Sequence, residues 1–152
     1  MDTAAAVPLS IERTLEGFFA QSRMLRHPAM WTRSHGVRRK LERYLDLECE
    51  RFLTDSEKVL VHAERQLHSL GAVVRVAGPE TLLHALPGFL GQRWLPRHPA
   101  LARVQIMVVS EIVSYLPTAG ILDRRRVACS ILEVEAQVIR ARQVLAEAAD
   151  PT

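Results

Sequence analysis

The stretch that decides the fold is IERTLEGFFAQSRMLRHPA, residues 11–29, because it recurs 71 positions later as LLHALPGFLGQRWLPRHPA, residues 82–100. Eight of the 19 aligned positions are identical without a gap, where unrelated stretches share roughly one or two. The same offset aligns Tyr44-Leu45 with Tyr115-Leu116. Self-similarity at a fixed period is typical of a duplicated structural unit. The sequence therefore predicts two copies of one unit.

Apolar residues recur at spacings of three and four in both halves, which predicts amphipathic helices. Pro28 and Pro99 each follow an Arg-His pair and suit the first position of a helix. A capping-box pattern at 54–57 predicts the start of a third helix, and Asp123 predicts the cap of its counterpart. The apolar run AVVRV at 72–76 lies between the two halves and is expected to be an extended linker.

We therefore predict an all-α fold, a six-helix bundle built from two degenerate three-helix tandem repeats about a pseudo-two-fold axis. A flexible N-terminal tail is expected at 1–9 and a single helical domain at 10–149. Repeat one spans about 8–71 and repeat two about 79–142, with the C-terminal helix extending to about 149. The third helix of each repeat is expected to bury an equivalent apolar stripe, at positions 60, 63, 67 and 70 and at positions 131, 134, 138 and 141.

The composition is that of an ordinary globular protein, with 48% hydrophobic and 24% charged residues. Cys49 and Cys129 do not occupy equivalent places in the two repeats, so we expect no disulfide framework and a reducing compartment. Residues 1–7 lack a basic and apolar signal pattern, which favours a cytoplasmic location. The apolar segment 104–122 is interrupted by Pro117 and Gly120, which predicts a buried helix and no membrane partner.

The duplicated Arg-His-Pro-Ala is the main candidate binding site. Arg26 and His27, like Arg97 and His98, precede a predicted helix start, where free amides and the helix dipole favour an anionic ligand. The competing interpretation is that the histidines cap the helices. The two tryptophans lie four residues from these histidines, and packing at the interhelix corner is favoured over a role in the site for Trp31 and Trp94.

Two basic clusters are candidates for contact with nucleic acid or a partner: Arg38, Arg39 and Lys40, and Arg124, Arg125 and Arg126. The competing interpretation is a solvated helix face, because acidic residues follow the first cluster at spacings of three and four. The second cluster is expected at the positive end of a helix dipole, where it would be unfavourable without a partner. Glu111 is the lone charge in an apolar helix, so we expect it to be buried and paired with Lys40 or Arg126.

No nucleophile–base arrangement, glycine-rich phosphate loop or paired-carboxylate pattern is recognisable, and no catalytic residue, cofactor or metal is predicted. Glu64 and His68 lie one helical turn apart without a third ligand. The lack of such patterns argues against an enzyme but does not decide whether the protein is one. We predict a regulatory protein-interaction or adaptor module that self-associates, as a homodimer, through its C-terminal helical hairpin. The alternative is a regulator that binds nucleic acid or a phosphorylated ligand through the arginine clusters and the duplicated helix starts.

Overall fold

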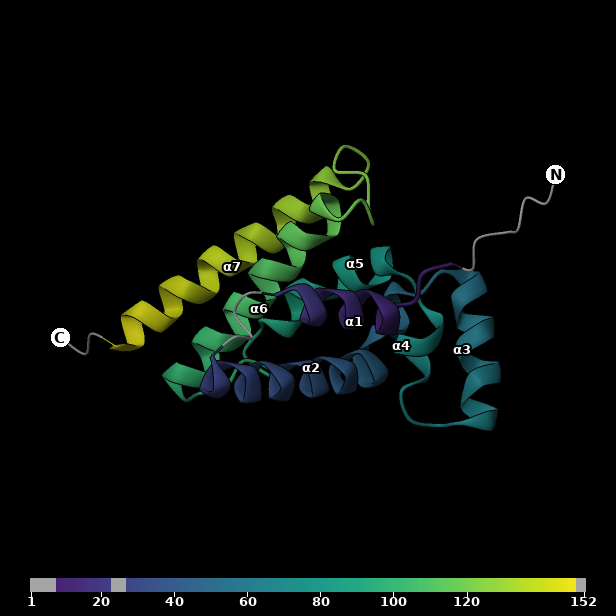
Figure 1. Cartoon of the computed structure of the whole chain (residues 1–152), viewed down its shortest axis with the longest axis horizontal. Helices are drawn as coiled ribbons and strands as arrows, with labels where there is room; N and C mark the ends of the chain where they lie inside the picture. The colour runs from purple at the N-terminus through teal and green to yellow at the C-terminus, as the bar shows by residue number, and fades with distance from the viewer. Residues whose placement is uncertain (1–7, 23–26, 150–152) are drawn as a thin grey trace.

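The computed structural model describes residues 8–22 and 27–149, and within these ranges the chain contains helices and no strands (Figure 1). The elements are α1 (Ile11–Gln21), α2 (Pro28–Glu48), the 3-10 turn η2 (Cys49–Phe52), α3 (Asp55–Leu67), α4 (Ala72–Val76), α5 (Pro79–Phe89), α6 (Pro99–Thr118) and α7 (Ala128–Ala149). The predicted all-α fold class is confirmed. Most of the tail predicted at 1–9, together with Arg26, lies outside the described residues.

The predicted starts of the second helices are confirmed, because α2 begins at Pro28 and α6 at Pro99. The Asp123 carboxylate accepts a hydrogen bond from the Arg125 amide at 3.0 Å, and the Asp123 carbonyl accepts one from the Val127 amide at 3.2 Å. Asp123 thus caps a turn that leads directly into α7, which begins at Ala128.

A reciprocal pair of aromatic contacts joins the two halves of the chain. Tyr44 of α2 packs against Phe89 of α5 with ring centroids 5.3 Å apart. Tyr115 of α6 packs against Phe18 of α1 with ring centroids 5.5 Å apart. The offset of 71 relates Tyr44 to Tyr115 and Phe18 to Phe89. Each half therefore places its tyrosine on the phenylalanine of the other, and α1, α2, α5 and α6 form the centre of one continuous core.

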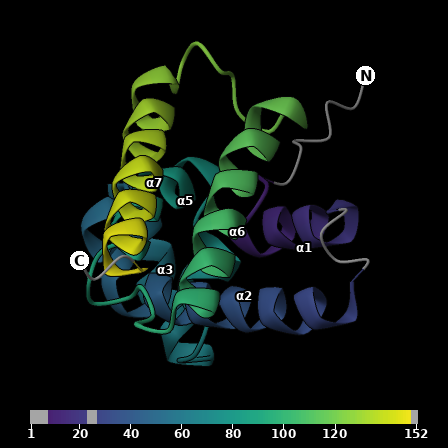
Figure 2. The ribbon, with the colours of Figure 1, turned by 90° about the vertical axis from the view of Figure 1, so that its left-hand side faces the viewer.

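The third helices of the two halves are placed differently. Helix α7 runs antiparallel to α6 and also contacts α5 (Figure 2). Helix α3 stands at the opposite end of the molecule and packs mainly against α4, which itself contacts α1 and α2 (Figure 1). The predicted equivalence of the two repeats, about 8–71 and about 79–142, as three helices each is therefore wrong for the third helix. The short α4 takes the place against α1 and α2 that α7 has against α5 and α6.

The prediction of an extended linker at 72–76 is also wrong, because this segment is the helix α4. Gly71 has a φ of 74°, a left-handed conformation that favours glycine, and it turns the chain inward. The side chains that follow are buried, with exposed fractions of 0% for Ala72, 1% for Val73 and 5% for Val74. Since these side chains fill the space against α1 and α2, that surface is not available to the apolar stripe of α3.

Helix α6 has the length and apolar composition of a membrane-crossing helix, but nine of its residues are buried against the rest of the protein. Glu111 lies on its exposed side, so the predicted burial of this carboxylate is wrong. The desolvation cost that required a basic partner does not arise. Arg126, one of the two partners considered, pairs with Glu80 of α5 at 3.1 Å.

The Glu57 carboxylate ties the start of α3 to α5. It completes the predicted capping box by accepting the Thr54 amide at 3.0 Å. It also accepts the Thr81 hydroxyl at 2.7 Å and the Gly78 amide at 2.8 Å. Burial alone would raise the pKa of Glu57, but the hydrogen bonds from Thr54, Thr81 and Gly78 outweigh burial and hold this pKa below its ordinary value.

We expect Glu57→Gln to lower the free energy of unfolding at pH 7 by about 1–2 kcal/mol, a value reduced for partial solvent exposure. The folded-state pKa lies below the unfolded-state value of about 4.3. The contribution of the carboxylate is therefore fully present above that value and is lost as the pH falls through the folded pKa. Urea unfolding of both proteins between pH 7 and pH 3 measures the difference. A gap that stays constant at low pH would contradict this account.

Candidate interaction surfaces

Helix α3 turns its apolar side to solvent, and only Val61 of its 13 residues is buried. This exposed stripe, which we call the α3 face, has exposed fractions of 69%, 54%, 76% and 81% at its four large side chains and a smaller exposed alanine between them: Val59, Leu60, Leu67, Leu70 and Ala63. The predicted burial of positions 60, 63, 67 and 70 is therefore wrong. An amphipathic helix in a soluble monomer ordinarily turns its apolar stripe to the core, and a continuous exposed patch indicates an interaction site.

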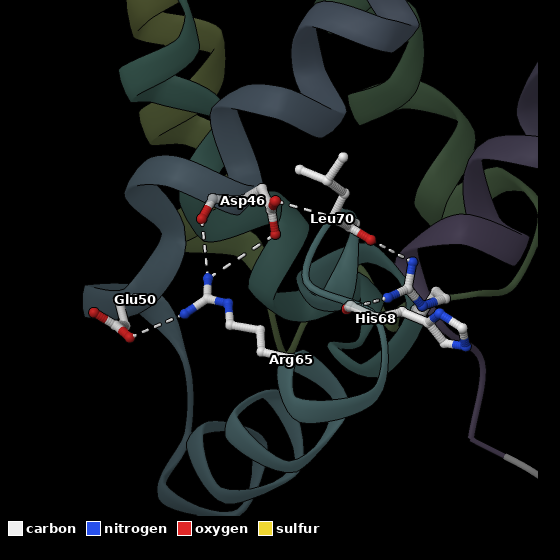
Figure 3. Close-up of polar contacts among 7 residues, drawn as sticks. Asp46, Glu50, Arg65, His68 and Leu70 are labelled. Carbon is white, nitrogen blue, oxygen red and sulfur yellow. Dashed lines mark hydrogen bonds and ion pairs between the residues drawn. The ribbon is translucent and has the colours of Figure 1, made fainter.

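The polar side of α3 is bonded to α2 and η2. The Arg65 guanidinium donates to the Asp46 carbonyl at 3.0 Å and lies 3.9 Å from the Asp46 carboxylate (Figure 3). It also donates to Glu50 at 3.4 Å. Because Arg65 extends from α3 towards these two acids, the helix is held with its polar side inward and its apolar side outward.

A second arginine, Arg75 of α4, fixes the turn that follows α3. Its guanidinium donates to the His68 carbonyl at 2.9 Å and to the Leu70 carbonyl at 2.7 Å (Figure 3). It also donates to the Glu64 carboxylate at 2.8 Å. The Gly71 amide donates to the Asp46 carboxylate at 3.2 Å. These bonds hold the turn from His68 to Gly71 against α2 and α4. The α3 face is thus presented on a firmly bonded segment.

The apolar seam predicted on the last helix is buried within the chain. Its members on α7 have exposed fractions of 6% or less: Ile131, Val134, Val138 and Ala141. Farther along α7, Leu145 is partly buried and Ala148 is exposed. The outer side of α7 retains exposed apolar side chains at 64%, 55% and 60%: Leu132, Ile139 and Val144. The predicted self-association through this hairpin would have to use the outer side and stays a prediction.

A groove of about 620 Å³ runs along the N-terminal half of α2, between α1 and α4. Its floor and walls carry two aromatic rings, three arginines and two carboxylates: Trp31, His35, Arg38, Arg39, Arg75, Glu12 and Glu42. Arg38 pairs with Glu42 at 3.2 Å, while Arg39 is exposed. We call this feature the α2 groove.

Aromatic rings follow one another along one wall of the α2 groove. The ring centroids of Trp31 and His35 are 4.1 Å apart, and those of His35 and Phe19 of α1 are 5.4 Å apart. The Arg38 guanidinium lies 5.4 Å from the centre of the Phe19 ring, a cation–π geometry. Burial first, then the charges of Arg38 and Arg39, lower the pKa of His35. The Trp31 side chain remains 49% exposed, so packing alone does not account for a tryptophan at this position.

The duplicated helix starts do not meet. His27 and His98 occupy the cap positions of α2 and α6, but neither side chain makes a capping hydrogen bond. Figure 2 shows the first turns of α2 and α6 at separate places on the molecule. Arg97 is exposed, and Arg26 lies outside the described residues. An anion site at either helix start stays a prediction.

Trp94 is packed as predicted. Its ring lies 5.2 Å from Tyr44, and its indole nitrogen donates a hydrogen bond to the Glu48 carboxylate. Gln105, a buried residue that sequence reasoning did not single out, holds the turn before α6 by donating to the carbonyls of Phe89 at 2.8 Å and Trp94 at 3.1 Å. These contacts assign Trp94 to the corner between α5 and α6.

The two basic clusters differ in their surroundings. Lys40 is partly buried, and burial lowers its pKa. Arg124, Arg125 and Arg126 are exposed and belong to the turn before α7. This turn directly precedes the N-terminus of α7, so the second cluster lies at the positive end of the helix dipole, as the sequence predicts. Contact of either cluster with nucleic acid stays a prediction.

Within residues 8–22 and 27–149, no cluster of three or more histidine, cysteine or acidic side chains is close enough to hold a metal ion. Glu64, one of the two residues weighed as ligands, is bonded to Arg75, and His68 is exposed. Comparison with protein-family models, curated proteins and solved structures finds no match to this chain. The α3 face and the α2 groove are therefore the two candidate interaction surfaces of this chain.

Proposed function

We propose that this chain is a protein-interaction module that self-associates through the α3 face. The observation that carries the proposal is the orientation of α3 and the turn after it, in which Arg65 and Glu64 are bonded to the protein while the four large apolar side chains of the α3 face are 54–81% exposed. Together with Ala63 they present on the order of 500 Å² of apolar surface, near the upper end of what monomers expose. Removing this surface from water stabilises an assembly.

A second copy of the chain suits the α3 face because Val59 and Leu67 lie at equal distances along the sequence on either side of Ala63, the smallest member of the stripe. An antiparallel pair of α3 helices with its two-fold axis at Ala63 brings Val59 opposite Leu67 of the partner subunit, and the same contact recurs on the other side of the axis. The small alanine allows the two helices to approach closely. Polar residues around the stripe raise the buried area towards the roughly 800 Å² per partner of a standard interface.

The α3 face also offers more apolar surface for self-association than the outer side of α7 does. It combines three large apolar side chains of α3 with Leu70 of the turn that follows, and Leu67 and Leu70 line a surface hollow of about 540 Å³. The outer side of α7 carries three such side chains, Leu132, Ile139 and Val144, beside the exposed Glu135 and Arg142. Since the seam of α7 is already buried on α6, the remaining surface on α7 is smaller and more polar.

The internal duplication accounts for the presence of an apolar stripe on α3. We propose that the two halves are degenerate tandem repeats related by a pseudo-two-fold axis through the α2–α6 contact. The reciprocal contacts of Tyr44 with Phe89 and of Tyr115 with Phe18 support this arrangement. In repeat two the third helix buries its stripe, whereas in repeat one α4 occupies that place and the stripe stays on the surface.

Sedimentation equilibrium of the full chain tests the proposal. We expect a concentration-dependent monomer–dimer equilibrium that Leu60→Ser/Leu67→Ser abolishes, because the substitutions remove most of the apolar contact. The matched control is Leu132→Ser/Ile139→Ser on α7, which should leave the equilibrium unchanged. A protein that stays monomeric up to about 1 mM, or a dimer lost only in the α7 variant, would refute self-association through the α3 face.

A further inference from the structure

The α2 groove occupies the surface of repeat one that corresponds to a covered surface of repeat two. The offset of 71 relates Trp31, His35, Arg38 and Glu42 of α2 to a stripe on α6. The four residues of that α6 stripe are buried, with exposed fractions of 3% or less: Ala102, Ile106, Val109 and Val113. Helix α7 runs along α6, where Val113 borders Val134 and Val138. The residues of the α2 stripe instead line an open groove.

The difference follows from the lengths of the covering helices. Helix α7 has 22 residues, whereas α4 has five and supplies only Val74 and Arg75, with the preceding Gly71, to the groove. A helix rises 1.5 Å per residue, so α4 cannot cover a 21-residue helix such as α2. The uncovered part of α2 lines the α2 groove, which has a volume of about 620 Å³.

The groove differs from its counterpart in charge. The charged side chains that line the groove are three arginines and two carboxylates, a net charge of +1: Arg38, Arg39, Arg75, Glu12 and Glu42. Arg38 pairs with Glu42 and Arg75 with Glu64, which leaves the exposed Arg39 on the wall of the groove. The corresponding residues on α6 are Val109, Ser110 and Val113. A helix that fits the groove must therefore supply carboxylates where α7 supplies apolar contacts.

We propose that the α2 groove binds an acidic amphipathic helix of another protein, in the position against α1 and α2 that α7 holds against α5 and α6. An apolar side chain of that helix packs on the exposed ring of Trp31, and its carboxylates pair with Arg39 and Arg38. The groove and the α3 face involve different residues, so one chain binds its own copy and a second protein at separate surfaces. This arrangement is that of an adaptor.

Binding of a synthetic helical peptide to the full-length chain tests the proposal. The peptide has about 20 residues, with leucine at the a and d positions of three heptads and glutamate at e and g. A second peptide carries lysine in place of glutamate. Fluorescence anisotropy should show binding of the glutamate peptide, weakened about tenfold or more by Arg39→Glu and by Trp31→Ala. The matched control Arg43→Glu changes an exposed arginine of α2 outside the groove and should leave binding within about twofold.

Several results would overturn the proposal. Equal binding of the glutamate and lysine peptides would remove the charge argument, and equal losses in Arg39→Glu and Arg43→Glu would indicate general attraction to a basic surface. Peptide binding lost in Ala63→Asp would place the peptide on the α3 face. Displacement of the peptide by a single-stranded oligonucleotide at lower concentration than by unlabelled peptide would assign the groove to nucleic acid. Absence of binding would refute a helix-binding groove outright.

Discussion

Replacing Val134 with aspartate should unfold most of the protein, whereas the same replacement at Ala63, its counterpart at the offset of 71, should leave the monomer folded. Val134 is fully buried between α7 and its neighbours. A carboxylate without a partner in that position costs more than about 4 kcal/mol, a large part of the stability of a domain. Ala63 is exposed, so Ala63→Asp costs only its lower helix propensity, about 0.5 kcal/mol.

Urea unfolding followed by circular dichroism, at concentrations where sedimentation shows monomers, measures both variants. The contrast between equivalent positions tests whether α7 buries the stripe that α3 exposes. Equally large losses of stability in Val134→Asp and Ala63→Asp would mean that the α3 stripe is buried in solution. Equally small losses would mean that α7 does not pack on α6.

Replacing Gly88 with alanine should destabilise the protein by about 2–4 kcal/mol, although alanine is the better helix former by about 1 kcal/mol. A Cβ at Gly88 would lie well inside van der Waals contact with the Tyr44 hydroxyl. The Tyr44 ring is 1% exposed and its hydroxyl donates to the Ala85 carbonyl at 2.7 Å, so the ring cannot move aside without losing that bond. The close approach of α2 and α5 thus requires glycine.

A double-mutant cycle separates this clash from a general effect of the substitution. Tyr44→Phe removes the hydroxyl, so Gly88→Ala should cost much less in that background, and the two substitutions should be strongly non-additive. The reciprocal variant Gly17→Ala is the matched comparison. Its Cβ would lie 2.7 Å from the Tyr115 hydroxyl, but Tyr115 is partly exposed and can shift, so the loss should be smaller. Additive effects at Gly88 and Tyr44 would contradict the proposed packing.

The sequence predicted the features that depend on local chemistry. The prolines at 28 and 99 and the capping box at 54–57 set helix starts through backbone groups a few residues apart, and the structure has helices that begin there. The duplicated Gly-Phe and Tyr-Leu pairs indicated a repeat, and they are the residues that make the reciprocal contacts between the halves. Such contacts recur because both copies carry the same side chains.

The placement of α3 could not be predicted because it depends on competition for one surface. Positions 60, 63, 67 and 70 have the same apolar spacing as positions 131, 134, 138 and 141. Periodicity shows that a helix has an apolar side and does not show what covers it. The signal was the apolar run at 72–76, which has small and β-branched side chains suited to burial. A run of five residues is too short to show helical periodicity, so the sequence predicts an extended linker where the structure has the helix α4.

The α2 groove was also beyond prediction, although two of the clusters singled out in the sequence contribute to it. The sequence places Arg38 and Arg39 in a basic cluster and favours packing for Trp31, and nothing in it joins these residues into one site. Their convergence requires the uncovered side of α2, which follows only once α4 replaces a longer helix. The sequence therefore contains the residues of the candidate site, and the fold brings these residues together.

Site-specific cross-linking tests self-association through the α3 face most directly. Ala63→Cys is made in a Cys129→Ser background, where the remaining Cys49 is buried, and is treated with a short bifunctional maleimide. Because the proposed two-fold axis passes through position 63, we expect a covalent dimer from Ala63→Cys and none from the matched α7 variant Ile139→Cys. A dimer formed through position 139 and not through position 63, or none from either variant, would contradict the account.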